Sequence, residues 1–347
     1  MDKKNILDLS KNDLSLLLQE MCQPSFRTKQ LLNGIYQKLY TDFWEFANIP
    51  ILLRQELDNK FVINPLIVEN HIATKDKLTE KLLFKLQDGA TIESVLMRFE
   101  RRNTLCVSTQ VGCPMGCVFC ATGQMGFTRN LTSGEILAQI LYFQRKLRDE
   151  GEALRNIVYM GMGEPFLNYA NVSNSLYSIS DPEMIGLGAR HITVSTVGII
   201  PKIFLFGKDH PQVNLAISLH APNDTLRSQL LPANRIYPLF ALMKACREYI
   251  AMTNRKLTFE YALINSVNDS DILAHEFANL VKGMLTIVNL ITLNASQEYP
   301  TPGSPQERVQ DFRDILVHHG IRTTVRLRRG IEINAGCGQL ASQQKLK

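Results

Sequence analysis

The sequence has no apolar run long enough to cross a membrane. Its N-terminus, from Met1 to Asn5, also lacks the basic-then-apolar pattern of a secretory signal peptide. We therefore expect a cytoplasmic protein with no membrane association, in which cysteines stay reduced and serve as ligands or catalysts. The chain also lacks a strong excess of charge. Its net charge of +5 is only weak evidence for a nucleic-acid partner. At 347 residues the chain can hold one large domain and a small accessory one.

A fourth metal ligand is missing beside three closely spaced cysteines, Cys113, Cys117 and Cys120. A structural zinc site needs four ligands, and the nearest histidine downstream is His191. A tetra-iron cluster held by three thiolates keeps one iron open, and that iron can bind a substrate or cofactor directly. The spacing therefore predicts an iron–sulfur cluster at which chemistry takes place.

The same spacing, i, i+4 and i+7, would also place three inert cysteines on the apolar face of a helix. Gly112, Pro114 and Gly116 favour a loop instead. Zinc and core cysteines remain the alternatives to a cluster.

Composition and periodicity divide the chain into four parts. Residues 1–65 predict a helical accessory domain, with a cap-like opening at Ser10 and an apolar stripe that includes Phe26. Residues 66–98 alternate as in a small β meander, residues 99–341 carry the cysteines, and residues 342–347 form a tail.

The third part alternates between strand and helix, which predicts an α/β fold. With six or seven strands, a partial TIM-type (β/α)6 barrel is the favoured architecture. The strands are expected at 104–109, 156–160, 191–196, 213–219, 257–263, 286–293 and 321–327, and the helices at 131–148, 170–180, 238–252, 271–282 and 305–319.

Polar residues follow the expected strands at the end where such barrels place their sites. The segment from Gly161 to Pro165 offers glycines that let the backbone approach a ligand, and a carboxylate for an ammonium group. An ordinary turn or strand-end cap is the alternative reading of each position. The candidate cofactor-binding residues are Gly163, Glu164, Pro165, Ser195, Ser218, Leu219, His220 and Asn294.

Two short basic runs stand out against the modest net charge. They could neutralise RNA phosphates or could simply be a solvated charged face. The first comprises Arg98, Arg101 and Arg102, and the second comprises Arg322, Arg326, Arg328 and Arg329.

Four segments carry a resemblance to a known family: residues 104–113, 160–165, 217–224 and 337–340. The spacing C-x3-C-x2-C with Phe119 before the last cysteine resembles the radical S-adenosylmethionine superfamily. The four segments together resemble its RlmN/Cfr family of RNA adenosine methyltransferases, from about residue 90 to residue 341.

This resemblance implies a [4Fe–4S] cluster on Cys113, Cys117 and Cys120, and two molecules of S-adenosylmethionine per turnover. It implies that Cys337 accepts a methyl group, which reaches an adenine ring carbon as a radical and leaves a covalent RNA–protein adduct. It further implies that Cys106 resolves the adduct through a transient Cys106–Cys337 disulfide. Glu93 matches the family's proton acceptor, although Cys106 could itself remove the proton.

The resemblance also implies the partners: 23S rRNA, tRNA and an external one-electron reductant, with a monomeric enzyme. RlmN-type members methylate carbon 2 of adenosine at the peptidyl transferase centre and next to the anticodon, and Cfr-type members methylate carbon 8 of the same rRNA base. Pro165 favours the RlmN type. Glu332, Asn334 and Gly336 depart from the family's usual residues before the cysteine.

Two alternatives of other kinds stay open. One is a non-catalytic iron–sulfur RNA-binding protein, which would have no use for the glycine-flanked Cys337, expected as an exposed, mobile thiol. The other is a radical enzyme acting on a small molecule or peptide.

Overall fold

The computed structural model describes residues 3–296, 299–326 and 329–341; the expected tail and Arg328 lie outside these ranges. Its main feature is a ten-stranded sheet in the order β14-β13-β12-β11-β10-β9-β6-β5-β4-β3. Seven neighbouring strands run parallel. They are β6 (Arg102–Cys106), β9 (Leu154–Tyr159), β10 (Ile192–Thr196), β11 (Asn214–Ser218), β12 (Leu257–Leu263), β13 (Thr286–Thr292) and β14 (Thr323–Val325).

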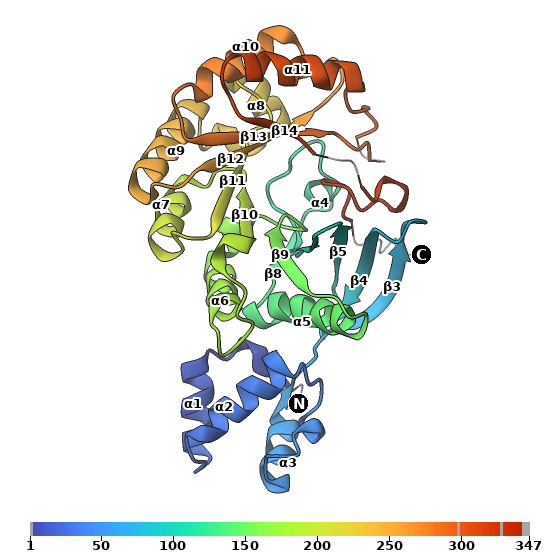
Figure 1. The fold of residues 1–347 in the computed structure, drawn as a ribbon, viewed down its shortest axis with the longest axis vertical. Helices are drawn as coiled ribbons and strands as arrows, with labels where there is room; N and C mark the ends of the chain where they lie inside the picture. Colours follow the sequence, from blue (N-terminus) through green and yellow to red (C-terminus); the bar gives the residue numbers. More distant parts are fainter. Residues whose placement is uncertain (1–2, 297–298, 327–328, 342–347) are drawn as a thin grey trace.

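Helices connect the parallel strands and pack outside the arc that the strands form (Figure 1). Six strand–helix units precede β14, and the sheet ends at β14 on one side and β3 on the other. The prediction of a partial (β/α)6 barrel is therefore confirmed. The helices are α5 (Ser133–Asp149), α6 (Tyr169–Ser180), α7 (Ile200–Asp209), α8 (Asp224–Leu230), α9 (Leu239–Thr253), α10 (Asp271–Val281) and α11 (Gln306–His318).

The expected meander does not stand apart from the barrel. Strands β3 (Ile67–Ala73), β4 (Thr79–Lys85) and β5 (Thr91–Phe99) are antiparallel, and β5 pairs with β6. Residues 66–98 thus extend the same sheet beyond its parallel part, as the blue strands of Figure 1 show.

The N-terminal segment forms a separate group of helices at the end of the molecule opposite α10 and α11 (Figure 1). It contains α1 (Lys11–Glu20), α2 (Phe26–Leu32) and α3 (Ile51–Lys60), closed by the parallel pair β1 (Lys4–Asn5) and β2 (Phe61–Val62). The expected apolar stripe is buried except at Phe26. This residue begins α2 and is exposed, and the Arg27 guanidinium lies over its ring.

Two capping boxes fix helix starts, the first of them at the cap-like opening expected at Ser10. Ser10 and Asp13 exchange side-chain and backbone hydrogen bonds at α1, and Thr132 and Glu135 do so at α5. The second box ends the segment that carries the cysteines, so α5 begins at a defined point after it.

The cysteine loop is bracketed by a small hairpin. Strand β7 (Gln110–Gly112) pairs with β8 (Phe127–Asn130), and α4 (Ala121–Gln124) lies between them. Short turns of 3-10 or π helix complete the fold at Ile6–Asp8, Asn33–Gln37, Phe43–Glu45, Pro165–Asn168, Ala189–His191, Pro232–Arg235 and Ile331–Ile333. Within the described ranges, no helix has the length and apolar character that a membrane crossing requires.

Candidate active site

One cavity lies at the carboxyl ends of the parallel strands, where the strand-end residues were expected to meet. Cys113, Cys117 and Cys120 all line it. Its space of about 920 Å³, open mouth included, falls within the range of small-ligand and cofactor sites. We call it the three-thiol cavity.

The loop that carries the three thiols has a left-handed backbone at Gly112 and Gly116, with φ of 76° and 61°. The Cys113 N–H donates to the Gly126 carbonyl at 2.7 Å, which joins the start of the loop to its end. Phe119 is buried between the second and third cysteines and meets the His220 ring edge-on. The loop expected from glycine and proline is therefore confirmed, and the three cysteines do not share a helix face.

The three thiols line one cavity, and cysteine thiolates are the usual ligands of iron–sulfur clusters. Burial raises the pKa of Cys113 to about 12, so metal binding there would release protons.

Glu164 lies in the same cavity and is buried without a cation. Its carboxylate accepts hydrogen bonds from the Val197 N–H at 2.9 Å and the Phe166 N–H at 3.0 Å. No lysine or arginine of the described ranges forms an ion pair with it. Burial raises the pKa of Glu164 to about 7. The ammonium group of a ligand would stabilise the charged carboxylate and lower this pKa.

The two glycines before Glu164 are needed mainly because other protein atoms pack closely against them, and less because a ligand approaches the backbone. At Gly163, with φ of 103°, a Cβ atom would lie 2.6 Å from the Gln110 Cβ. At Gly161 it would lie 2.6 Å from the Val107 carbonyl oxygen. Both glycines thus let the end of β9 press against the segment that leads to the cysteines, and both still line the cavity.

Ser195, Ser218 and His220 come together on the strand-end wall. The two serine hydroxyls lie 3.3 Å apart across β10 and β11. The His220 Nδ1 accepts from the Ala262 N–H at 2.9 Å, so the ring carries its proton on Nε2. Burial lowers the pKa of His220 to about 3, which keeps the ring neutral.

The remaining candidates lie elsewhere. The Leu219 side chain points into the core and is fully buried, as alternation along a strand requires. Pro165 is buried at the start of a 3-10 turn and does not line the cavity. Asn294 lines the neighbouring cavity described next.

A smaller cavity adjoins the first, and Cys337 lines both. Cys106, Asn294, Arg326 and Arg329 line the smaller one. Burial, and secondarily the charge of Cys337, raise the pKa of Cys106 to about 12. All cysteines are free thiols. We call this space the thiol-pair cavity.

Cys337 is not fully exposed, which corrects the expectation of an exposed thiol. It is half-buried, and its Sγ lies 3.3 Å from the Arg326 Nη1. Hydrogen bonds flank it, because the Gly338 carbonyl accepts from the Ala121 N–H at 2.7 Å and the Gln339 amide donates to the Ala295 carbonyl at 3.0 Å.

The residues that depart from the family pattern have specific places in this loop. Asn334 adopts a left-handed backbone with φ of 50°. Glu332 accepts from the Lys75 N–H at 3.0 Å. A Cβ atom at Gly336 would collide with the Asn294 amide, so glycine lets Asn294 lie against the loop.

Glu93 is buried on β5, on the same face of the sheet as Cys106. Val95 pairs directly with Cys106, and Glu93 lies two residues before Val95. The Glu93 carboxylate does not line either thiol-bearing cavity. It meets the Lys81 ammonium at 3.0 Å and accepts from the Ala341 N–H at 3.0 Å.

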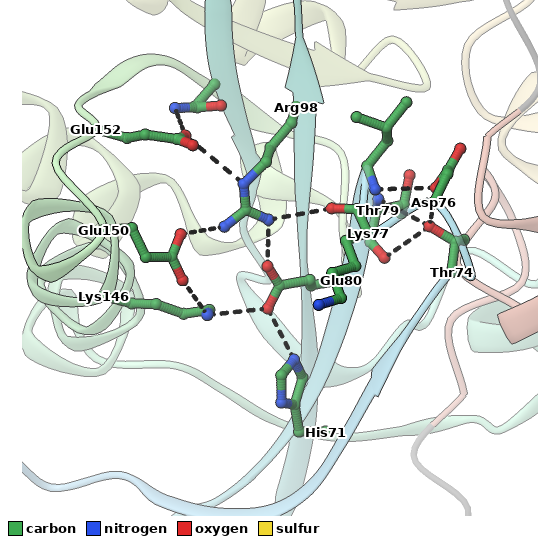
Figure 2. Close-up of polar contacts among 12 residues, drawn as sticks. His71, Thr74, Asp76, Lys77, Thr79, Glu80, Arg98, Lys146, Glu150 and Glu152 are labelled. Carbon is green, nitrogen blue, oxygen red and sulfur yellow. Dashed lines mark hydrogen bonds and ion pairs between the residues drawn. The ribbon is translucent and has the colours of Figure 1, made fainter.

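The two basic runs partly come together, but their arginines have different surroundings. Arg98 is not a free phosphate ligand, because its guanidinium is bound by Glu80 and Glu150 (Figure 2). Arg326 is half-buried beside Cys337 and lines the cavity there. Arg101, Arg102 and Arg329 line an open groove together with Arg155.

Sequence reasoning missed three site residues. Arg326 follows β14 directly, so the strand-end rule that found Ser195 could have found it. Glu260, which lines the three-thiol cavity from within β12, carries no such positional signal. Lys81 lies on an outer strand, and nothing local to it indicates that it meets Glu93.

Three thiols at the carboxyl ends of the strands of an open barrel define a radical S-adenosylmethionine enzyme, and the model of the radical SAM superfamily matches residues 107–277. The model described as ribosomal RNA large subunit methyltransferase N-terminal domain matches residues 4–63. The chain belongs to the RlmN family of radical SAM RNA methyltransferases. Its chemistry therefore uses a [4Fe–4S] cluster and S-adenosylmethionine, and its substrates are RNA.

Curated relatives match over nearly their whole length. A probable dual-specificity RNA methyltransferase RlmN of Clostridium tetani is 45% identical over 97% of this chain and 95% of its own. The protein of the same description from Chloroflexus aurantiacus is 43% identical over 100% and 95%. The crystal structure of a radical SAM methyltransferase from Sphaerobacter thermophilus superposes with a TM-score of 0.95 at 45% identity, over 97% of this chain and 99% of that one.

Proposed function

We propose that this enzyme methylates carbon 2 of adenosine in 23S rRNA, at the peptidyl transferase centre, and in tRNA, at the adenosine next to the anticodon. The observation that carries the proposal is that Cys337 lines both the three-thiol cavity and the thiol-pair cavity. One sulfur atom can then face the cofactor on one side and Cys106 on the other.

The cofactor side uses residues that the geometry brings together. Cys113, Cys117 and Cys120 would hold the cluster, and the buried Glu164 carboxylate would take the amino group of S-adenosylmethionine. Ser195, Ser218 and His220 offer hydroxyl and ring N–H groups to its ribose and carboxylate. Gly163 lines the same cavity, and Asn294 borders it from the neighbouring one.

When bound, the cluster and two molecules of S-adenosylmethionine supply a methyl group and a hydrogen-abstracting radical, with electrons from an external one-electron reductant. Cys337 receives the methyl group on Sγ. The radical would then take one hydrogen atom from that methyl group, and the resulting carbon radical would bond to the adenine ring. The adduct radical would return one electron to the cluster, and Glu93 or Cys106 takes the ring proton.

Cys106 then attacks the Cys337 sulfur, and the bond from that sulfur to the methylene carbon breaks. The electron pair left on carbon takes up a proton, which yields the methylated base. The two sulfurs form a disulfide that is reduced before the next turnover.

RNA would reach Cys337 as an extruded base, with phosphate contacts fixing its position. We propose that residues 1–65, which include the family's N-terminal domain, contact that RNA, that residues 66–98 carry Glu93, and that residues 99–341 perform the chemistry as a monomer in the cytoplasm.

Nucleoside mass spectrometry of rRNA and tRNA tests the proposal, with cells that carry and cells that lack the gene. We expect 2-methyladenosine in both RNA classes only when the gene is present. A gene-dependent 8-methyladenosine in rRNA would replace the proposal by the Cfr-type reaction, and the absence of any gene-dependent methyladenosine would refute both.

A further inference from the structure

Glu93 is held between two parts of the chain that are far apart in sequence. It is 4% exposed, and its carboxylate lies between Lys81 on β4 and Ala341 beyond the Cys337 loop. Among the described ion pairs, Lys81 is its only cationic partner, at 3.0 Å. A buried carboxylate keeps its charge only when such a partner offsets the loss of water.

Lys81 also contacts the chain just before Cys337. Its ammonium donates to the Asn334 carbonyl at 3.1 Å, three residues before Cys337. The Glu93 carboxylate accepts from the Ala341 N–H, four residues after Cys337. The Lys81–Glu93 pair therefore holds the Cys337 loop on both sides.

The sheet places this pair in register with the second thiol. Lys81 pairs with Val95, and Val95 pairs with Cys106, so these residues form one row across β4, β5 and β6. Opposed residues on neighbouring strands share a face of the sheet. Lys81, Glu93 and Cys106 consequently lie on the face that the Cys337 loop covers.

A separate cavity of about 750 Å³, open mouth included, gives the pair access to solvent. Lys81, Glu93, Asn70 and Asn334 line it, and Glu332 is the other charged group there. The Glu332 carboxylate accepts from the Lys75 N–H and forms no described ion pair with Lys81. A proton taken up by Glu93 can leave to water on this side without crossing either thiol-bearing cavity.

We propose that Lys81 is a positioning residue of the methyl transfer, which holds Glu93 as a charged base and ties it to the loop that carries Cys337. The inference rests on the proposed role of Glu93 as the acceptor of the ring proton. In that step the carbon–hydrogen bond breaks, the proton bonds to a Glu93 oxygen, and the electron pair stays with the ring.

Electrostatics support the same role. Burial raises the pKa of Glu93, and the charge and hydrogen bond of Lys81 oppose that rise. Without Lys81 the neutral form of Glu93, which cannot accept a proton, would become more populated at a given pH.

The test compares Lys81→Met, Lys81→Arg and Glu93→Gln in the full-length, reconstituted enzyme with unmodified tRNA. The single-turnover rate of methylated RNA formation is measured from pH 5 to pH 9, and the RNA–protein adduct is followed on denaturing gels. We expect Lys81→Met to slow product formation by on the order of tenfold at pH 7, to shift the acidic limb of the profile to higher pH and to accumulate adduct. Lys81→Arg, which keeps the charge, should restore most of the rate.

A second readout does not depend on turnover. Carbon-13 NMR of the side-chain carboxyls, with Glu93→Gln used for assignment, follows the titration of Glu93 in the protein without RNA. Its midpoint should rise in Lys81→Met. An unchanged midpoint, or a rate reduced by the same factor at every pH, would overturn the inference.

Two outcomes separate this inference from the function itself. If Glu93→Gln resolves the adduct at the wild-type rate, Glu93 is not the acceptor and the inference fails, while the methylation reaction stands. If the wild-type enzyme forms no methyladenosine at all, the proposed function fails. Melting temperature and iron content of each variant check that the variants fold and load the cluster.

Discussion

The two thiols of the thiol-pair cavity differ in their surroundings, and this difference suits different roles. Cys106 is buried with a raised pKa, whereas Cys337 is half-buried and touches the Arg326 guanidinium. Cys106 becomes reactive only after a neighbouring group takes its proton.

Replacing each of the two cysteines by alanine tests these roles separately. We expect Cys337→Ala to form no methylated RNA, because no sulfur accepts the methyl group. Cys106→Ala should lower product formation at least a hundredfold and should accumulate RNA joined through a methylene bridge to Cys337, since no second thiol displaces it. Denaturing gels with labelled RNA and mass spectrometry of the joined peptide measure both results. Cys246→Ala, a buried cysteine outside both cavities, is the matched control. Normal methylation by Cys106→Ala would contradict the assignment.

Residues could be predicted from sequence where the signal is local. The spacing of Cys113, Cys117 and Cys120 is carried by eight consecutive positions, and the chemistry follows from it. The contact between Lys81 and Glu93 depends on the register of two strands, and the contact between Arg326 and Cys337 depends on a loop folding back over the barrel. No periodicity encodes either one, so only the structure reveals them.

At the scale of elements, a buried ionic network fastens the antiparallel strands to helix α5. Figure 2 shows Glu80 of β4 between His71 of β3 and Arg98 of β5, with Lys146 and Glu150 reaching in from the end of α5. Burial favours the neutral form of Glu80, but Arg98, Lys146 and His71 outweigh it and hold its pKa below the usual value.

This network predicts an acid-sensitive contribution to stability. A carboxyl with a lowered pKa in the folded state stabilises the fold above its unfolded pKa of 4.5, and that stability is lost as the pH falls through the folded value. Glu80→Gln should therefore cost about 3 kcal/mol at pH 7 and lose less further stability than the wild type below about pH 4.5.

Urea denaturation across pH measures this prediction. Glu56→Gln, which removes an exposed ion pair with Lys60, is the control and should cost about 0.5 kcal/mol or less. Equal losses in the two variants would show that burial of the network contributes nothing.

The turn between β5 and β6 presents a second feature, a groove that suits the RNA backbone. The Phe99 ring lies between two guanidinium groups, that of Arg102 at 5.1 Å and that of Arg329 at 4.5 Å. Arg101 and Arg155 line the same groove, which also contains Glu100 and Glu152. Arg329 borders the thiol-pair cavity as well, so the groove lies beside the cavity that Cys106 and Cys337 line.

Removing two charges from this turn should weaken RNA binding in a salt-dependent manner. We expect Arg101→Gln with Arg102→Gln to lower tRNA affinity by about tenfold at low salt and to reduce the slope of log affinity against log salt by about 1 to 2. Fluorescence anisotropy with labelled tRNA measures both quantities. Arg313→Gln on α11, outside the groove, should change neither. An unaltered slope in the double variant would mean that these arginines are only solvated.

The elements themselves were largely predictable, because strand and helix periods repeat over many residues. Expected strand ends at residues 160, 196 and 263 agree with β9, β10 and β12 to within one residue. The pairing of residues 66–98 with the barrel sheet could not be predicted. The sequence of an antiparallel strand does not indicate which strand pairs with its other edge. The arginines of the first basic run likewise look alike in sequence, and only packing assigns Arg98 to Glu80 and Arg101 to solvent.

At the scale of the whole molecule, the N-terminal segment contacts both ends of α5 and the loop after α6. The Asp8 carboxylate accepts from the Gly134 N–H at 2.7 Å and so caps a helix of the barrel from outside it. Lys11 forms an ion pair with Glu183, and the Arg148 guanidinium donates to the Lys38 carbonyl at 2.6 Å. These contacts set the direction in which the N-terminal domain would present RNA to the barrel.

Replacing Gly134 by alanine tests this docking, because the expected change in stability has opposite signs with and without it. In a free helix, replacing glycine by alanine stabilises by up to about 1 kcal/mol. In the docked structure the new Cβ would lie 2.8 Å from the Asp8 backbone nitrogen and would meet the Asn5 amide, so Gly134→Ala should destabilise by about 1 to 3 kcal/mol.

The same substitution in an Asn5→Ala, Asp8→Ala background should cost less, because part of the opposing surface is gone, and the difference measures the coupling between the two parts. Urea denaturation gives the stabilities, and the KM for tRNA should rise in Gly134→Ala if orientation matters for RNA. A stabilised Gly134→Ala variant with an unchanged KM would show that the N-terminal domain does not rest on α5 in solution.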